Sequence, residues 1–143
     1  IVVDKDTDAY LKEKNGTKIV NIATPTKKGV SHSKFKDFSV DKNGAVINNK
    51  YEDSRSELIN DTVEGNKNLK EGVAKVALFD VTGQNKSELK GTIEALSKND
   101  LSVILSNENG ITVDGANFIN IHNMTLTTSK VKDNDGKLEY SKL

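Results

Sequence analysis

The side chains that could carry out acid–base or metal chemistry are few in this chain and lie far apart in the sequence. His32 and His122 are its two histidines, and it has no cysteine. A zinc site needs three or four such ligands at short, characteristic spacings. We therefore interpret both histidines as polar residues beside turns, and the sequence predicts neither a bound metal nor a cofactor.

Two acidic segments carry part of the pattern of a calcium-binding loop. Asp4 to Asp8 alternates carboxylates, but Ala9 stands where such a loop needs glycine. Asp133 to Gly136 fails the same test, because Val131 occupies the first ligand position. The first segment is better explained as a solvated N-terminal segment, and the second as a turn.

The sequence also lacks the common patterns of catalysis. It holds no Ser-His-Asp set, phosphate-binding loop or dinucleotide fingerprint. A polysaccharide-processing enzyme is one alternative, but that chemistry needs acidic and basic residues clustered on one face. We therefore expect a protein that is not an enzyme.

The remaining candidate site residues belong to two short motifs in which asparagines alternate with other residues. They are Asn66, Lys67, Asn68 and Leu69, and Asn107, Glu108, Asn109, Gly110 and Ile111. Asparagine and glycine tolerate left-handed backbone, and asparagine side chains bond nearby backbone groups. In stacked turns such side chains form ladders, so a structural role in turns is one interpretation of both motifs.

The elements that would position these motifs are short strands. Between Leu101 and Thr128, apolar pairs and triplets recur every few residues, separated by Asn, Asp and Gly. Such strands have too little connecting chain to pair antiparallel, which favours an all-β coil of stacked parallel strands. Because side chains alternate between the two faces of a strand, the pattern predicts one set that faces the core and one that faces outward. Facing inward are Val103, Leu105, Ile111, Val113, Phe118, Ile121 and Leu126; facing outward are Ser102, Thr112 and Thr127.

Three segments of different character make up the predicted single domain, residues 1–143. Residues 1 to about 48 are expected to form a cap of two hairpins, turning at Asn15-Gly16 and at Asn43-Gly44, since Asn-Gly favours two-residue turns. Residues 49–72 are the most polar run and predict a surface excursion. Residues 73–143 would form the stacked strands, incomplete at the C-terminal end. After Lys130 the chain either forms a hairpin at Asp135-Gly136 or frays.

Composition excludes some partners. Lys and Arg number 21, as do Asp and Glu, so the net charge is zero and gives no electrostatic case for nucleic acid or an anionic membrane. No stretch approaches the roughly 20 apolar residues of a membrane span. Hydrophobic residues make up 34% of the chain, which suits a narrow coil with a core only a few side chains wide.

The order of several motifs resembles the secretion domain of two-partner-secreted exoproteins, the filamentous-haemagglutinin-like family, also called the haemagglutination-activity domain. The segment from Asn21 to Asn49 resembles the family's opening block, and the two asparagine motifs follow in the family's order. The family usually has proline second in each motif, where this chain has Lys67 and Glu108. Ser33 stands where the family often has asparagine.

The resemblance implies a right-handed parallel β-helix, or solenoid, with an N-terminal antiparallel hairpin cap. It implies the N-terminal secretion module of a large bacterial exoprotein, which crosses the periplasm and reaches the cell surface or the medium. The implied partner is an outer-membrane β-barrel transporter with POTRA domains, which would recognise the two motifs. The module would then template β-helix folding at the surface.

Two alternatives concern what the domain or the whole exoprotein does. The domain itself could be an adhesive module that contacts host glycans or proteins, although 5% aromatic residues argues against a surface for stacking sugars. The full exoprotein could also be an adhesin that binds host-cell surface molecules, a cytolysin or a contact-dependent toxin.

Overall fold

The computed structural model describes residues 1–141, which are almost entirely β-strand and loop. Sheet A contains, in spatial order, β1 (Val2–Val3), β4 (Val30–Asp37), β8 (Val76–Val81), β11 (Ser102–Ser106) and β14 (Asn123–Thr127). Sheet B contains β13 (Phe118–Ile119), β10 (Ile93–Leu96), β5 (Ala45–Asn48), β3 (Thr17–Asn21) and β2 (Tyr10–Lys14). Sheet C pairs β12 (Ile111–Val113) with β9 (Ser87–Leu89).

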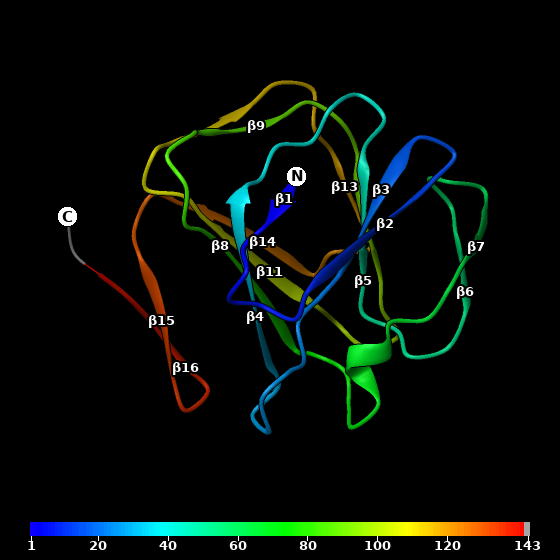
Figure 1. Ribbon diagram of the computed structural model, residues 1–143, viewed down its shortest axis with the longest axis horizontal. Helices are drawn as coiled ribbons and strands as arrows, with labels where there is room; N and C mark the ends of the chain where they lie inside the picture. The colour runs from blue at the N-terminus through cyan, green and yellow to red at the C-terminus, as the bar shows by residue number, and fades with distance from the viewer. Residues whose placement is uncertain (142–143) are drawn as a thin grey trace.

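The chain visits the three sheets repeatedly in the same order. It runs from β8 in sheet A through β9 in sheet C to β10 in sheet B, and then repeats this path with β11, β12 and β13. Equivalent strands of successive circuits pair in parallel. We call one circuit a rung; the stacked rungs enclose the core (Figure 1). The prediction of an all-β protein with stacked parallel strands is confirmed.

Parallel register places similar side chains above one another. In sheet A, Phe79, Leu105 and Leu126 occupy equivalent positions on β8, β11 and β14. Three aromatic rings pack together in the core, with Phe35 lying 5.0 Å from Phe38 and 5.2 Å from Phe79 between ring centroids. The edge-to-face geometry of these pairs adds to the free energy gained by burial.

Antiparallel strands close the N-terminal end of both main sheets. β1 pairs with β4, and β2 pairs with β3 across the predicted turn, where Asn15 and Gly16 both have positive φ. The hairpin predicted at Asn15-Gly16 is therefore confirmed. It covers the first edge of sheet B, which would otherwise expose a row of unpaired backbone groups.

The second predicted hairpin, at Asn43-Gly44, is wrong. The strands on either side, β4 and β5, lie in different sheets and pair in parallel with later strands. Gly44 instead forms a tight corner of the coil: its φ is +79°, and a Cβ atom there would lie 2.5 Å from the Thr92 carbonyl oxygen. The stacked rungs therefore start before residue 48.

Two hairpins project sideways from the coil (Figure 1). One consists of β6 (Ser54–Ser56) and β7 (Asp61–Val63), and the other of β15 (Val131–Asn134) and β16 (Lys137–Tyr140). A backbone hydrogen bond closes the base of each, from Asn66 N to the Lys50 oxygen at 2.8 Å and from Ser141 N to the Lys130 oxygen at 2.9 Å. In each hairpin the two ends therefore lie side by side at the base.

These hairpins correspond to two of the predicted features. Most of the polar run 49–72 is the β6–β7 insertion, but Asn66 and Leu69 are buried in the coil. Of the two alternatives after Lys130, the hairpin at Asp135-Gly136 is the one that forms.

No helix among the described residues is long and apolar enough to cross a membrane.

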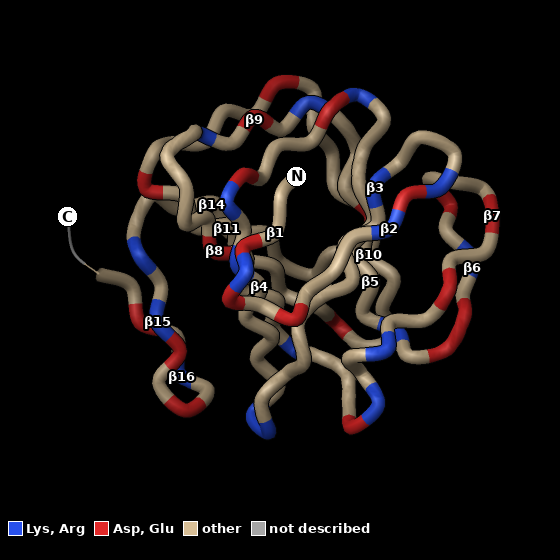
Figure 2. Tube along the Cα trace, in the orientation of Figure 1, with Lys and Arg blue, Asp and Glu red and all other residues tan. Residues whose placement is uncertain are grey.

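Each inserted hairpin covers the outer face of one main sheet. Ile59 and Val63 of the first pack against Ile19, Val46 and Leu96 on sheet B. Val131 of the second packs against Leu78 and Ile104 on sheet A. Charged residues of both signs follow one another along the hairpins and outer loops (Figure 2).

The final strands are more exposed than the sequence suggested. Val103 and Leu105 are fully buried as predicted, but Val113, Phe118 and Leu126 are exposed, and Ile111 and Ile121 are half-buried against the core. Thr112 is exposed, whereas Ser102 and Thr127 are half-buried. Val113, Phe118 and Leu126 stand in register with the buried residues Leu89, Ile93 and Leu105. They are exposed because β12, β13 and β14 are the last strands of their sheets, so their columns end there.

This difference predicts unequal effects for two leucines in one column. Leu105→Ala should lower the free energy of unfolding by about 2–5 kcal/mol through lost burial and a new cavity. Leu126→Ala should cost clearly less, because Leu126 is 36% exposed. Urea unfolding followed by circular dichroism measures both, and equal losses would contradict this account of the core.

Candidate functional site

Asn66 begins the first asparagine motif where the β6–β7 hairpin rejoins the coil. It caps the short 3-10 helix η1 (Lys67–Leu69), and its side-chain oxygen accepts a hydrogen bond from Asn68 N. Its side-chain nitrogen donates to the carbonyl oxygens of Ile22 and Asn48, each at 3.0 Å. Asn66 is fully buried, so its amide joins the η1 corner to the preceding strands.

The other residues of this motif reach the N-terminal cap. The backbone N–H of Lys67 donates to the Tyr10 hydroxyl at 3.0 Å. Asn68 donates through its side chain to the carbonyl oxygen of Asp8 at 2.9 Å. Leu69 is buried in the main core. The motif thus fastens residues 8–10 to the first rung.

The second motif turns the chain from β11 in sheet A to β12 in sheet C. The side chain of Asn107 donates to the Asn85 carbonyl oxygen at 3.0 Å and to the Ser87 hydroxyl at 2.9 Å. Asn109 donates to the Gly83 carbonyl oxygen at 2.8 Å. Residues 83–87 form the equivalent corner of the rung below, so these amides link successive rungs.

The last residues of the second motif differ in exposure. Glu108 is exposed, and its carboxylate lies 3.6 Å from the Lys130 ammonium. Gly110 has φ +113°, a conformation that L side chains rarely adopt. Ile111 is half-buried and packs against the core from β12.

The two motifs share one local geometry but occupy separate corners. In each, the first asparagine accepts a side-chain bond from the N–H two residues later. Its carbonyl oxygen accepts from the N–H three residues later. The first motif contacts the cap, the second contacts residues 83–87, and no hydrogen bond joins the motifs within the described chain.

Asparagines outside the two predicted motifs make similar side-chain hydrogen bonds and were not identified from the sequence. Asn49 exchanges two hydrogen bonds with Ala74, at 2.9 and 2.8 Å, and is fully buried. The side chain of Asn48 donates to the Asn21 side-chain oxygen at 2.9 Å. Asn120 donates to the Ala95 carbonyl oxygen at 2.9 Å. The pair Asn48-Asn49 after an apolar run was the sequence signal that could have identified them.

Buried carboxylates hold both inserted hairpins in place. Glu94, on β10, accepts hydrogen bonds from Ser56 Oγ at 2.6 Å and Glu57 N at 2.9 Å. Asp80, on β8, lies 2.9 Å from His32 Nε2 and 3.3 Å from Lys130 Nζ. Burial raises the pKa of Asp80, but the hydrogen bond with His32 and the charge of Lys130 outweigh it, so this pKa lies below its ordinary value of 3.8.

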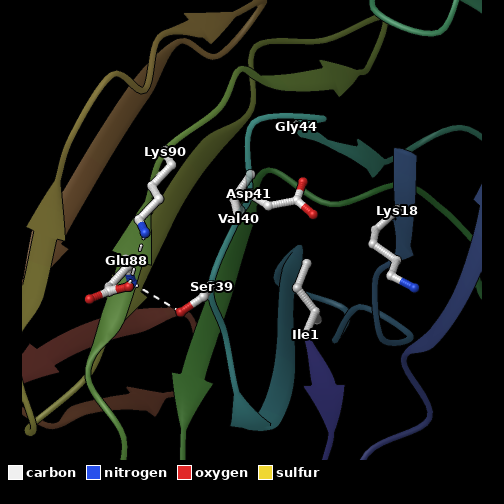
Figure 3. A pocket seen from close by; sticks show the side chains of 8 residues that line it. All are labelled: Ile1, Lys18, Ser39, Val40, Asp41, Gly44, Glu88 and Lys90. Atoms are coloured by element: carbon white, nitrogen blue, oxygen red, sulfur yellow. Dashed lines mark hydrogen bonds and ion pairs between the residues drawn. The ribbon is translucent and has the colours of Figure 1, made fainter. Parts of the chain in front are cut away.

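The remaining titratable groups are engaged in structural contacts or exposed. His122 lies beside Asp100 at 3.6 Å, and both side chains are exposed. A hollow of about 290 Å³ near the N-terminus contains Lys18, Asp41, Glu88 and Lys90 (Figure 3). There Glu88 pairs with Lys90 at 3.5 Å, and the Ser39 hydroxyl accepts from Glu88 N. The bond from Glu88 N to Ser39 joins β9 to the segment that follows β4.

The chain is similar to known proteins in sequence and in structure. A family model described as "TPS secretion domain" matches residues 2–142. The chain is 43% identical over 130 residues to "16S rRNA endonuclease CdiA" of Enterobacter cloacae, covering 90% of this chain and 4% of that protein. It is 41% identical over 130 residues to "Protein adenylyltransferase and cysteine protease IbpA" of Histophilus somni, covering 90% of this chain and 3% of that protein.

A solved structure agrees with these matches. The filamentous hemagglutinin secretion domain superposes with a TM-score of 0.86 at 37% identity, covering 96% of this chain and 45% of that one. The chain therefore spans a small fraction of the length of its curated relatives and about half of this structural neighbour.

The geometry of the second motif predicts opposite effects at two of its positions. Gly110→Val should lower the melting temperature by several degrees, because a β-branched residue is strained at this φ. Glu108→Pro should melt close to the wild type, since Glu108 N makes no backbone hydrogen bond within the described part of the chain and the lost ion pair is exposed. Thermal melts with Thr112→Val as the β-branched control measure this; an unchanged melt for Gly110→Val would reject the assigned role of Gly110.

Asp80 predicts an acid-dependent part of the stability. Because its pKa is lowered in the folded state, Asp80 contributes stability that is present above about 3.8 and lost as the pH falls further. Asp80→Asn should therefore be less stable than the wild type at pH 7, and the gap should narrow as the pH falls below 3.8. Urea unfolding at a series of pH values measures the gap, and a gap independent of pH would contradict the ionised pairing.

Proposed function

Because the chain belongs to the TPS secretion domain family, we propose that it is the N-terminal secretion module of a large bacterial exoprotein and does not itself catalyse a reaction. The sequence and structural similarities to exoproteins and to the haemagglutinin domain support this proposal. The chemistry of the exoprotein would reside outside this domain.

The partner in this proposal is an outer-membrane β-barrel transporter whose POTRA domains capture the unfolded chain in the periplasm. Capture by strand addition would use main-chain hydrogen bonds for affinity and alternate side chains for selectivity. The exoprotein would then reach the cell surface or the medium.

One observation supports the idea that the transporter recognises the two motifs before the chain folds. Asn66 and Asn107, the first residues of the two motifs, are fully buried in the folded domain. A transporter that contacts their side chains must therefore bind an unfolded or partly open chain. The secretion-signal role of Asn66 to Leu69 and Asn107 to Ile111 is compatible with their corner contacts, because the two roles apply to different states of the chain.

We also propose that the stacked rungs form a right-handed parallel β-helix within one domain, residues 1–143. Parallel strands joined by crossover connections are right-handed in nearly all proteins. After export, the far end of this β-helix would template the folding of further rungs. Its exposed apolar residues Val113, Phe118 and Leu126, together with the free edges of β13 and β14, support this role.

The names of the relatives favour one class of whole exoprotein. Several are named as nucleases or toxins, and we propose that this domain likewise belongs to a toxin rather than to an adhesin or a cytolysin. Strong binding of the isolated domain to host cells would instead favour an adhesive module.

The export signal can be separated from fold stability with three variants. Asn66→Ala combined with Asn107→Ala should reduce export through the cognate transporter at least tenfold, because the unfolded chain loses both motifs. Asn123→Ala combined with Asn134→Ala is the matched control, since both asparagines are exposed and their side chains make no hydrogen bond within residues 1–141.

Leu105→Ala is the stability control. It weakens the folded core but leaves both motifs intact, so it should be exported near the wild-type level. The measurement is the amount of exoprotein in the medium and on the surface of cells that express both partners. Undiminished export of the double-motif variant would refute the signal role.

A further inference from the structure

The first motif is bonded to the N-terminal part of the chain, whereas the second contacts residues 83–87. The second residue of each motif, Lys67 or Glu108, is exposed. Asn66 is 0% exposed and Leu69 is 2% exposed. The side chains of Asn66 and Asn68 and the backbone N–H of Lys67 all bond residues 8–22. In the second motif, Glu108 and Asn109 are exposed.

We propose that the N-terminal cap and the transporter compete for Asn66 to Leu69, and that the hydrogen bond between Lys67 N and the Tyr10 hydroxyl is the latch that closes the cap over this motif. This inference rests on the proposed secretion function. It adds a regulatory step: docking of residues 8–10 onto the motif ends the period in which the motif can be recognised.

The competition follows from the groups that each partner would use. Strand addition needs the main-chain donors and acceptors of the motif. In the folded domain Lys67 N bonds Tyr10, Asn68 N bonds the Asn66 side chain, and the Asn66 carbonyl oxygen accepts from Leu69 N. A transporter strand therefore gains access only when the cap is undocked and η1 is open.

Tyr10 is suited to be a latch because its bond lies at the surface. Tyr10 is half-buried on β2, the edge strand of sheet B, and its contact with Lys67 N is exposed to solvent. Breaking this bond does not open the main core.

The latch also depends on a departure from the family pattern. Proline, usual in the family at this position, has no N–H and could not donate to Tyr10. The backbone at Asn66, with φ −85° and ψ 113°, is extended, as required before proline, and position 67 is the first of η1. Lys67→Pro therefore suits this position and removes the donor, together with an exposed lysine side chain.

A closed latch lowers the apparent affinity of the folded domain for the transporter, because affinity scales with the fraction of molecules that are open. Losing one ordinary hydrogen bond should raise that fraction about fivefold. Tyr10→Phe makes this change outside the motif. Tyr140→Phe is the matched control: Tyr140 is 46% exposed, and no side-chain hydrogen bond from it is seen in residues 1–141.

The first experiment measures opening without the transporter. Hydrogen–deuterium exchange of the Asn68 and Leu69 amides should be about fivefold faster in Tyr10→Phe, with the Val103 to Leu105 amides of β11 unchanged. Lys67→Pro should give the same effect, and the double variant should give no further increase, since both changes remove one bond. Unchanged exchange in Tyr10→Phe, or fully additive effects, would overturn the latch.

The second experiment measures competition with the purified periplasmic segment of the partner transporter. Folded Tyr10→Phe should bind about fivefold more tightly than the wild type and Tyr140→Phe, whereas chains freshly diluted from urea should bind equally well. Faster exchange with unchanged affinity would overturn the competition and leave the secretion function standing. If chains diluted from urea fail to bind, the secretion function and this inference both fall.

Discussion

Hydrogen bonds from asparagine side chains at the corners of the coil are the interaction on which the rest of this structure depends. Within a sheet, parallel strands satisfy one another's backbone groups, but at each corner the chain leaves one sheet for the next and its carbonyl oxygens lose those partners. Asn49, Asn66, Asn107 and Asn120 supply amide donors at such corners. An apolar side chain there would leave buried backbone groups unpaired, at a cost of about 1–3 kcal/mol each.

The hairpins β6–β7 and β15–β16 are held by buried carboxylates. Each covers an apolar patch on the outer face of a main sheet and is held by a carboxylate from that sheet, Glu94 for β6–β7 and Asp80 for β15–β16. A buried carboxylate is tolerated only when its oxygens are satisfied. Ser56 and Glu57 of the first hairpin donate to Glu94, whereas Asp80 is satisfied by His32 of β4 together with Lys130 at the base of the second hairpin. Attachment of the hairpins is thus specified by polar contacts as well as by apolar area.

Secretion places opposite demands on the same residues. If the chain is recognised while extended, the motif side chains must be accessible, yet in the folded state Asn66 and Leu69 are buried. Asparagine suits both states, because its amide can bond a partner's backbone in an extended chain and the protein's own backbone in a corner. The N-terminal cap, through Tyr10 and the Asp8 carbonyl oxygen, couples these states at the first motif.

The sequence by itself determined the local conformations: period-2 strands, the Asn15-Gly16 hairpin and corners formed by the asparagine motifs, since these depend on backbone preferences of neighbouring residues. The tertiary structure decided what lies above each residue. Asn43-Gly44 became a corner because Thr92 of the next rung packs against it, and Leu105 and Leu126 share a column but differ in burial because β14 ends its sheet. The bonds of Asn66 to Ile22 and of Lys67 to Tyr10 join residues 44 and 57 positions apart. Contacts of that range depend on how the rungs stack, which local sequence patterns do not encode.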